Sequence, residues 1–184
     1  MTRENVVGIL KEGLYENFAS EMTQMMVERD ALDYIYDLAA NKVELNYPKV
    51  IRDQICFRAA YVLETVYFRY NHLFEKYIGS FFVDFPDTVN ESAKRHFTKM
   101  MVDLLKKQKP DREICEAVAE ASVRWITESK SRIAVKIGAV EVLLELAGDV
   151  EWIRDILPEL LEPLRQNATP GLAVRLKRWK TRLS

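Results

Sequence analysis

The sequence is poor in the residues that break or cross-link a chain. Its 184 residues include only six glycines, six prolines and two cysteines. Glycine and proline most often mark turns, so their scarcity favours long helices. Cys56 and Cys115 have apolar neighbours and no CxxC or Cys/His cluster. We therefore expect both thiols to be small core side chains in a reducing compartment rather than a disulfide.

Long apolar runs are also absent. No stretch approaches the roughly 18 consecutive apolar residues that cross a bilayer. The N-terminal sequence MTRENVVGILKEGLYENF mixes charges with apolar residues and lacks the apolar core of a signal peptide. With 48% hydrophobic and 30% charged residues, the composition is that of a globular domain. The sequence thus predicts a cytoplasmic protein that does not enter a membrane.

Catalytic and metal-binding motifs are missing as well. The sequence has no HExxH, GxSxG, GxxxxGK[ST] or glycine-rich loop, the patterns that zinc hydrolysis, a nucleophile elbow or a phosphate cradle require. His72 and Glu75 form a single pair three residues apart, whereas a carboxylate-bridged metal site needs two such pairs. We expect His72 and His96, the only histidines, to be solvated or at the edge of the core. No cofactor is predicted, and a non-enzymatic role is favoured over an enzymatic one.

The chain has almost no net charge, but its charges are unevenly spread. Its formal charge is −1 and its pI about 6.2, so nucleic acid is an unlikely partner for the molecule as a whole. The last 20 residues carry +6 and no acid, which leaves −7 on the other 164. This basic end either contacts phosphates or is a solvated helix face whose cations suit the helix dipole, and we favour the second interpretation. The six basic residues are Arg165, Arg175, Lys177, Arg178, Lys180 and Arg182.

One pattern of apolar residues occurs four times. Its members lie at offsets that place them on one stripe of a helix with 3.6 residues per turn. The four copies begin 37 to 42 residues apart, a period typical of helical repeats. The copies are Ile55, Ala59, Val62, Leu63 and Val66; Ala93, Phe97, Met100, Met101 and Leu104; Val135, Ala139, Val142, Leu143 and Leu146; and Leu172, Leu176, Trp179 and Leu183.

Each gap between two copies is expected to form one further helix. The segment DALDYIYDLAAN, which precedes the first copy, is expected to form another. Asp30 and Asp149 are expected N-caps, and Thr169 is expected to cap a last helix that starts at Pro170. The sequence therefore predicts an all-α superhelix of about four helical hairpins plus an N-terminal helix. The predicted single domain covers residues 1–184, with an N-terminal helical segment at 4–28 and repeats at about 30–70, 71–107, 110–148 and 149–183.

The stretches CFRAAYVLE and AVKIGAVEVLLELA resemble the second helix of a HEAT unit. Each second helix also has a basic residue near its start, as in HEAT-repeat and armadillo-like proteins. The resemblance covers roughly residues 30–183. It implies a superhelix that presents a concave surface to a partner. The basic residues near the four starts are Arg58, Lys94 with Arg95, Lys136 and Arg175.

The favoured function is a protein-interaction or scaffold module with an unknown protein partner. The alternative is a DNA-binding protein similar to the HEAT-like DNA alkylation repair glycosylases. The sequence names neither the partner nor the oligomeric state. Four aromatic residues, Tyr61, Tyr67, Phe68 and Tyr70, could form a binding surface, although core packing is favoured. The candidate binding surface consists of basic residues: Arg58, Arg95, Lys136, Arg175, Lys177, Arg178 and Arg182.

Overall fold

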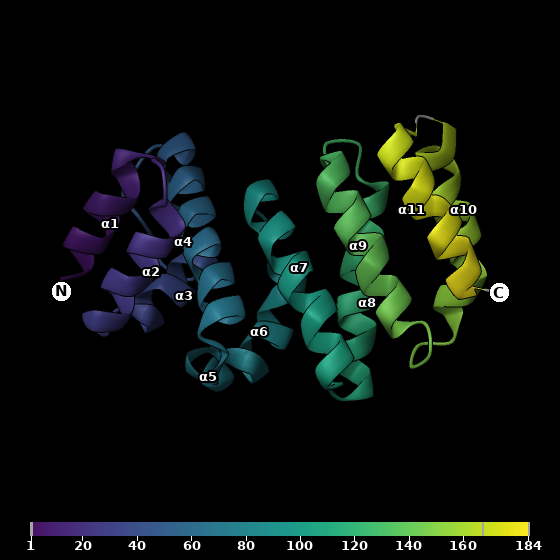
Figure 1. The fold of residues 1–184 in the computed structure, drawn as a ribbon, viewed down its shortest axis with the longest axis horizontal. Helices are drawn as coiled ribbons and strands as arrows, with labels where there is room; N and C mark the ends of the chain where they lie inside the picture. Colours follow the sequence, from purple (N-terminus) through teal and green to yellow (C-terminus); the bar gives the residue numbers. More distant parts are fainter. Residues whose placement is uncertain (1, 167, 184) are drawn as a thin grey trace. The chain divides into compact units, whose positions relative to one another are not determined.

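A computed structural model describes residues 2–166 and 168–183 (Figure 1). The described residues form helices and contain no strand, which confirms the all-α prediction. The chain divides into two compact units, an N-terminal unit of Met1–Met100 and a C-terminal unit of Met101–Ser184. The boundary between them falls inside α7 (Glu91–Lys107). The helices are α1 (Arg3–Glu12), α2 (Phe18–Glu28), α3 (Leu32–Ala39), α4 (Lys49–Arg69), α5 (Asn71–Phe74), α6 (Ile78–Asp84), α7 (Glu91–Lys107), α8 (Arg112–Thr127), α9 (Ile133–Leu146), α10 (Trp152–Gln166) and α11 (Pro170–Leu183).

The four apolar stripes lie on α4, α7, α9 and α11. All their members with a described side chain are buried, and most have no exposed surface at all. The side chain of Leu183, the last member, lies outside the described residues. Apolar spacing along the sequence therefore predicts the buried faces of these helices, because burial in a helix follows the 3.6-residue period.

The N-terminal helical segment predicted at 4–28 consists of two helices, α1 and α2. The chain turns between them with a positive φ at Gly13 (127°) and at Asn17 (63°). Glycine and asparagine adopt such angles at the lowest steric cost. The turn holds Leu14 and Tyr15 at the surface of the N-terminal unit.

The segment HLFEKYIGSFFVDF, residues 72–85 in the gap between the first two apolar stripes, is not the single helix expected there. It is divided among α5, α6 and two short 3₁₀ turns, Glu75–Tyr77 and Phe85–Asp87. Side chains three residues apart are aligned in a 3₁₀ turn, which suits the contact between the rings of Phe74 and Tyr77 at 5.8 Å. The ring centre of Phe81 lies 5.1 Å from that of Phe97 in α7, so this segment packs on α7 through aromatic contacts.

Two expected N-caps are wrong. Asp30 has a left-handed φ of 50°, and Ala31 is the N-cap of α3. The helix expected from Asp149 begins only at Trp152, and the Asp149 carboxylate instead pairs with Lys109 at 3.0 Å.

Other local expectations for the C-terminal unit are confirmed. α11 starts at Pro170, and the Thr169 hydroxyl accepts a hydrogen bond from the Leu172 amide at 3.4 Å. α10 continues as one helix through Pro158 and Pro163.

Both cysteines, Cys56 in the N-terminal unit and Cys115 in the C-terminal unit, are free and buried, as predicted. Burial raises the pKa of the Cys56 thiol to about 12. In the described part of the chain, no helix combines the length and apolar character needed to cross a membrane.

Candidate functional site

Arg58, the first candidate binding residue, contacts the end of a neighbouring helix. Its Nη1 donates hydrogen bonds to the carbonyl oxygens of Leu10 (2.5 Å) and Lys11 (3.0 Å) in the last turn of α1. A cation in this position satisfies carbonyl groups that the helix leaves unpaired. Burial lowers the pKa of the Arg58 guanidinium. Arg58 therefore connects α4 to α1 within the N-terminal unit.

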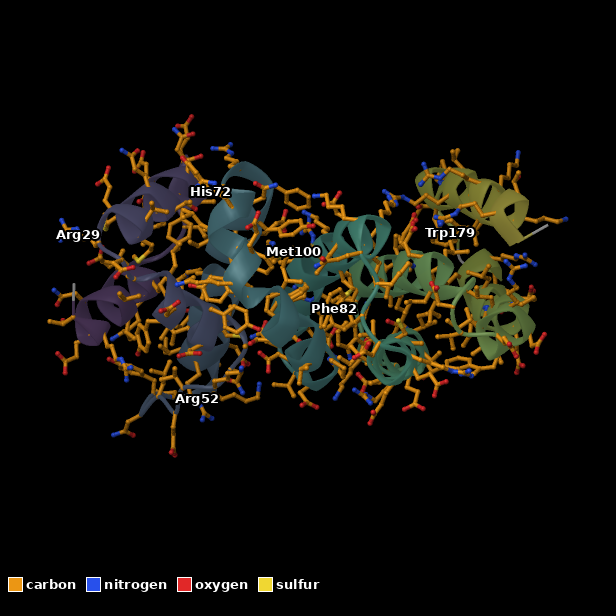
Figure 2. All side chains as sticks on the ribbon, turned by 90° about the horizontal axis from the view of Figure 1, so that it is seen from below. Arg29, Arg52, His72, Phe82, Met100 and Trp179 are labelled. Carbon is orange, nitrogen blue, oxygen red and sulfur yellow. The ribbon has the colours of Figure 1, made fainter. Side chains whose placement is uncertain are left out.

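Three candidate arginines of α11 converge on one carboxylate of α9. Arg175, Arg178 and Arg182 lie 3.4, 3.3 and 3.6 Å from Glu141, whose side chain is 14% exposed. Trp179 donates its Nε1–H to the same carboxylate at 2.8 Å. Figure 2 shows Trp179 on α11, and its side chain is fully buried. The three arginines are exposed, as expected of a solvated helix face, and they also pair with Glu141.

A second carboxylate of α9, Glu145, strengthens this contact. It lies 3.0 Å from Arg182 and 3.8 Å from Lys106. The Lys109 ammonium also donates to the Glu145 carbonyl oxygen. Much of the positive charge near α11 therefore meets acidic groups of the same unit. Glu141 and Glu145 therefore balance part of the positive charge of α11 where it packs against α9.

The other three candidate residues form no ion pair with Glu141 in the described part of the chain. Arg95 is exposed on α7, Lys177 is exposed on α11, and Lys136 is half-buried on α9. Of the seven candidate residues, the structure brings together Arg175, Arg178 and Arg182 around Glu141.

His96 forms a buried pair with Glu64 in the N-terminal unit. Its Nδ1 lies 2.5 Å from Glu64 Oε2, and Lys99 Nζ lies 3.0 Å from Glu64 Oε1. The His96 ring stacks on Tyr61 at 5.2 Å. Burial raises the pKa of Glu64, but the hydrogen bonds and charges of His96 and Lys99 outweigh it, so this pKa is lowered overall. His72 is exposed, so one histidine is at the core edge and one is solvated, as expected (Figure 2).

No group of three or more histidine, cysteine or carboxylate side chains among residues 2–166 and 168–183 could hold a metal ion.

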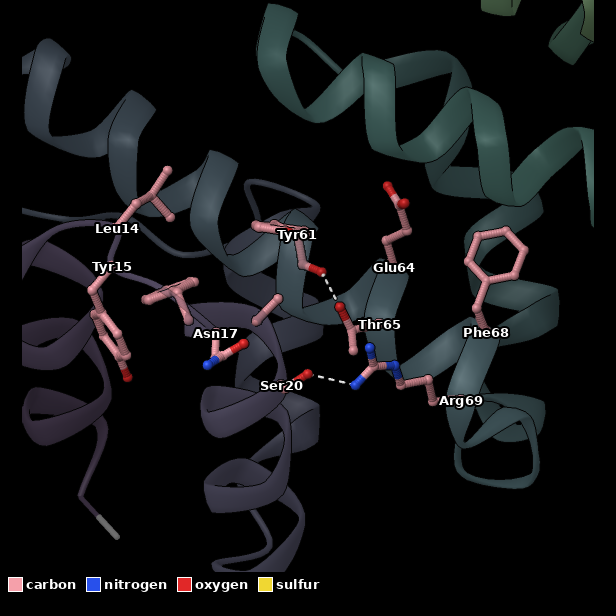
Figure 3. Close-up of a pocket in the computed structure, with 11 residues that line it drawn as sticks. Leu14, Tyr15, Asn17, Ser20, Tyr61, Glu64, Thr65, Phe68 and Arg69 are labelled. Atoms are coloured by element: carbon pink, nitrogen blue, oxygen red, sulfur yellow. Dashed lines mark hydrogen bonds between the residues drawn. The ribbon is translucent and has the colours of Figure 1, made fainter.

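A cavity of about 480 Å³ lies in the N-terminal unit, next to Glu64 (Figure 3). We call it the α4 cavity. One wall is a single face of α4, since its members are three or four residues apart. The opposite wall is the α1–α2 turn and the start of α2. The α4 residues are Tyr61, Glu64, Thr65, Phe68 and Arg69, and the residues opposite are Leu14, Tyr15 and Asn17 to Ser20.

Three large apolar side chains at this cavity are about half exposed. Leu14 is 51%, Tyr15 49% and Phe68 51% exposed. Arg69 donates a hydrogen bond to the Ser20 hydroxyl across the cavity, and this contact joins α4 to α2 (Figure 3). Exposed apolar side chains that line one cavity are typical of interaction sites.

Two members of the aromatic cluster line this cavity, whereas the sequence favoured core packing, which does not hold for the exposed Phe68. Phe68 and Tyr61 belong to the predicted aromatic cluster, whose member Tyr67 is buried in the core. Leu14 and Tyr15 were missed, because the sequence pattern did not show that a turn separates α1 from α2. Glu64 directly follows Leu63, a member of the first apolar stripe, and the sequence gives no other indication that Glu64 is partly buried.

Comparisons with known proteins leave the family open. No protein-family model, curated protein or solved structure matches this chain. The resemblance to HEAT-repeat and armadillo-like proteins therefore stays a prediction from the residues.

Proposed function

We propose that this protein is a non-enzymatic interaction module whose α4 cavity binds an apolar side chain from a protein partner. The observation that supports this proposal is the half-exposed trio of Leu14, Tyr15 and Phe68 around one cavity. Covering a large apolar side chain is worth roughly 1.5–3 kcal/mol when burial is complete. A partner that covers all three would gain a substantial part of its binding free energy there.

The size of the cavity suits an anchor residue. Its volume of about 480 Å³ lies within the range of roughly 300–1,000 Å³ that is typical of ligand pockets, so it has room for one large side chain. Aromatic side chains such as Tyr15 and Phe68 often contribute most to interface affinity. The Arg69–Ser20 contact holds the two walls together before a partner arrives. A cavity that is already formed loses less conformational entropy on binding.

The proposal retains the predicted superhelix. The consecutive helices α8 with α9 and α10 with α11 pack on each other within the C-terminal unit, as helical hairpins of a solenoid would. The proposal also places the module in the cytoplasm, in agreement with the sequence-based prediction.

The alternative of a DNA-binding or glycosylase-type protein has less support. Three of the seven basic residues in the candidate binding surface, Arg175, Arg178 and Arg182, pair with Glu141. Arg58 is bound to the end of α1.

Affinity capture with a matched pair of variants tests the proposed function. The double variant Leu14→Ser/Phe68→Ser removes two apolar side chains of the cavity. Val89→Ser is the control, because Val89 is equally apolar, exposed and outside the cavity. We expect at least one protein that the wild type and the control capture from native cell lysate, and that the double variant loses. Identical capture by all three proteins, each shown by circular dichroism to be folded, would contradict the proposal.

A further inference from the structure

The C-terminal unit contains a second cavity, of about 490 Å³, between the end of α8 and parts of α9 and α10. We call it the α10 cavity. Four aliphatic side chains line it: Ile126, Ile156, Leu160 and Leu164. Ile126 and Leu164 are buried, whereas Ile156 and Leu160 remain half-buried. The aliphatic residues of α10 share one face of that helix, since they are four residues apart. The cavity thus has a continuous apolar lining.

Two charged side chains, Lys136 and Glu159, border this apolar lining. Lys136 comes from α9 and is half-buried, and it has no ion-pair partner among the residues that the structure describes. In contrast, Glu141 and Glu145 of the same helix are both paired. A partly buried charge without a partner is costly and gains from an opposite charge placed beside it.

Glu159 comes from α10 and is exposed, so water screens its carboxylate. It still adds negative charge to the cavity rim. A ligand with one negative charge can meet Lys136 at little cost from Glu159, whereas a phosphate with two charges would meet stronger repulsion. The charges therefore favour a singly charged acid over a phosphorylated one.

We propose that the α10 cavity binds a free apolar monocarboxylate of the medium-chain fatty acid type. Its carboxylate pairs with the Lys136 ammonium, and its hydrocarbon chain covers Ile156 and Leu160. The cavity volume is in the range that small ligands occupy, roughly 300–1,000 Å³. The proposal concerns a different cavity from the α4 cavity and does not depend on the proposed function.

Decanoate is the probe, and isothermal titration calorimetry on the full chain is the measurement. We expect decanoate to bind the wild type. Lys136→Gln should weaken this binding roughly tenfold or more, because a hydrogen bond between charged groups is lost. Lys130→Gln is the matched control, since Lys130 is exposed and does not line the cavity. It should leave the affinity unchanged.

Two further arms separate the charge from the hydrocarbon. Decanol has the same chain without the carboxylate, so it should bind the wild type and Lys136→Gln equally. Leu160→Ala should weaken both ligands, because it removes part of the apolar lining. Thermal melting of each variant checks that it is folded.

Several results would overturn the inference. The first is a titration that shows no heat of binding at about 1 mM decanoate. The second is equal binding of decanoate to the wild type and to Lys136→Gln. The third is an affinity for inorganic phosphate or phosphatidylcholine vesicles, in place of decanoate, that depends on Lys136.

Discussion

Glu141 accepts contacts from four side chains of one helix, so we expect its charge to matter more than that of an ordinary surface acid. Glu141→Gln keeps an acceptor for the Trp179 indole but removes the charge that balances Arg175, Arg178 and Arg182. We expect the free energy of unfolding to fall by about 1–3 kcal/mol, measured by urea denaturation. Glu151→Gln is the control and should change it by no more than about 0.5 kcal/mol, because Glu151 is exposed. Equal losses in the two variants would show that the cluster adds no stability.

The lowered pKa of Glu64 makes a second prediction at the scale of one residue. Its folded-state pKa lies below the usual value of 4.5, so its charged form stabilises the fold above pH 4.5. That contribution is lost as the pH falls through the folded-state pKa. The stability difference between wild type and Glu64→Gln should therefore shrink as urea denaturation is repeated at decreasing pH below 4.5. Glu113→Gln, at an exposed position of α8, is the matched control for the removal of one carboxylate. A gap for Glu64→Gln that stays constant with pH would contradict the linkage.

At the scale of whole elements, the sequence predicted the helices whose apolar spacing is regular. The stripes on α4, α7, α9 and α11 are buried because burial imposes the helical period on the sequence. The breaks were harder to predict. Gly13 and Asn17 separate α1 from α2 through backbone angles. In the segment from α5 to α6, the ring of Phe81 packs on Phe97 of α7, a contact that local spacing does not predict.

The candidate site shows the same limit. The sequence located the basic residues of α11 but not their partner, because Glu141 precedes Arg175 by 34 residues and only folding brings the two together. Phe68 was recognisable as part of an aromatic cluster. Leu14 was not recognisable in this way, because only the α1–α2 turn places it at the same cavity as Phe68. Local patterns therefore predict which side of a helix is buried, and tertiary contacts decide which exposed residues meet.

The element α11 should be essential to the C-terminal unit. Leu172, Leu176 and Trp179 are buried, and each contributes roughly 1.5–3 kcal/mol of transfer free energy before the entropy of ordering is subtracted. This is a large share of the ~5–15 kcal/mol by which a domain is stable. A chain that ends at Gln166 should melt at a much lower temperature or aggregate in a thermal scan.

Val174→Ser provides the comparison for this truncation, because Val174 is an exposed residue of the same helix. We expect it to melt within a degree or two of the wild type, on the order expected for a surface change. If the truncated chain melted like the wild type, α11 would be a dispensable basic tail.

At the scale of the whole molecule, the balance of charge argues against tight binding of nucleic acid. The net charge is −1, and Arg182 contacts both Glu141 and Glu145. Binding to a labelled DNA duplex at physiological salt should therefore be no tighter than about 10⁻⁴ to 10⁻⁶ M, as for non-specific contacts. Fluorescence anisotropy measures this affinity directly.

The same argument predicts that releasing the arginines strengthens DNA binding. Glu141→Gln/Glu145→Gln removes both carboxylates that hold Arg178 and Arg182, so the guanidinium groups become free to contact phosphates. The control Glu113→Gln/Glu120→Gln changes the net charge equally but lies on α8. We expect the first variant to bind DNA more tightly than the control and with a steeper dependence on salt. Equal affinities would mean that net charge alone governs binding. Sub-micromolar binding of damaged duplex by the wild type, with release of a base, would instead favour the glycosylase alternative, because such affinity requires cationic groups that are free without mutation.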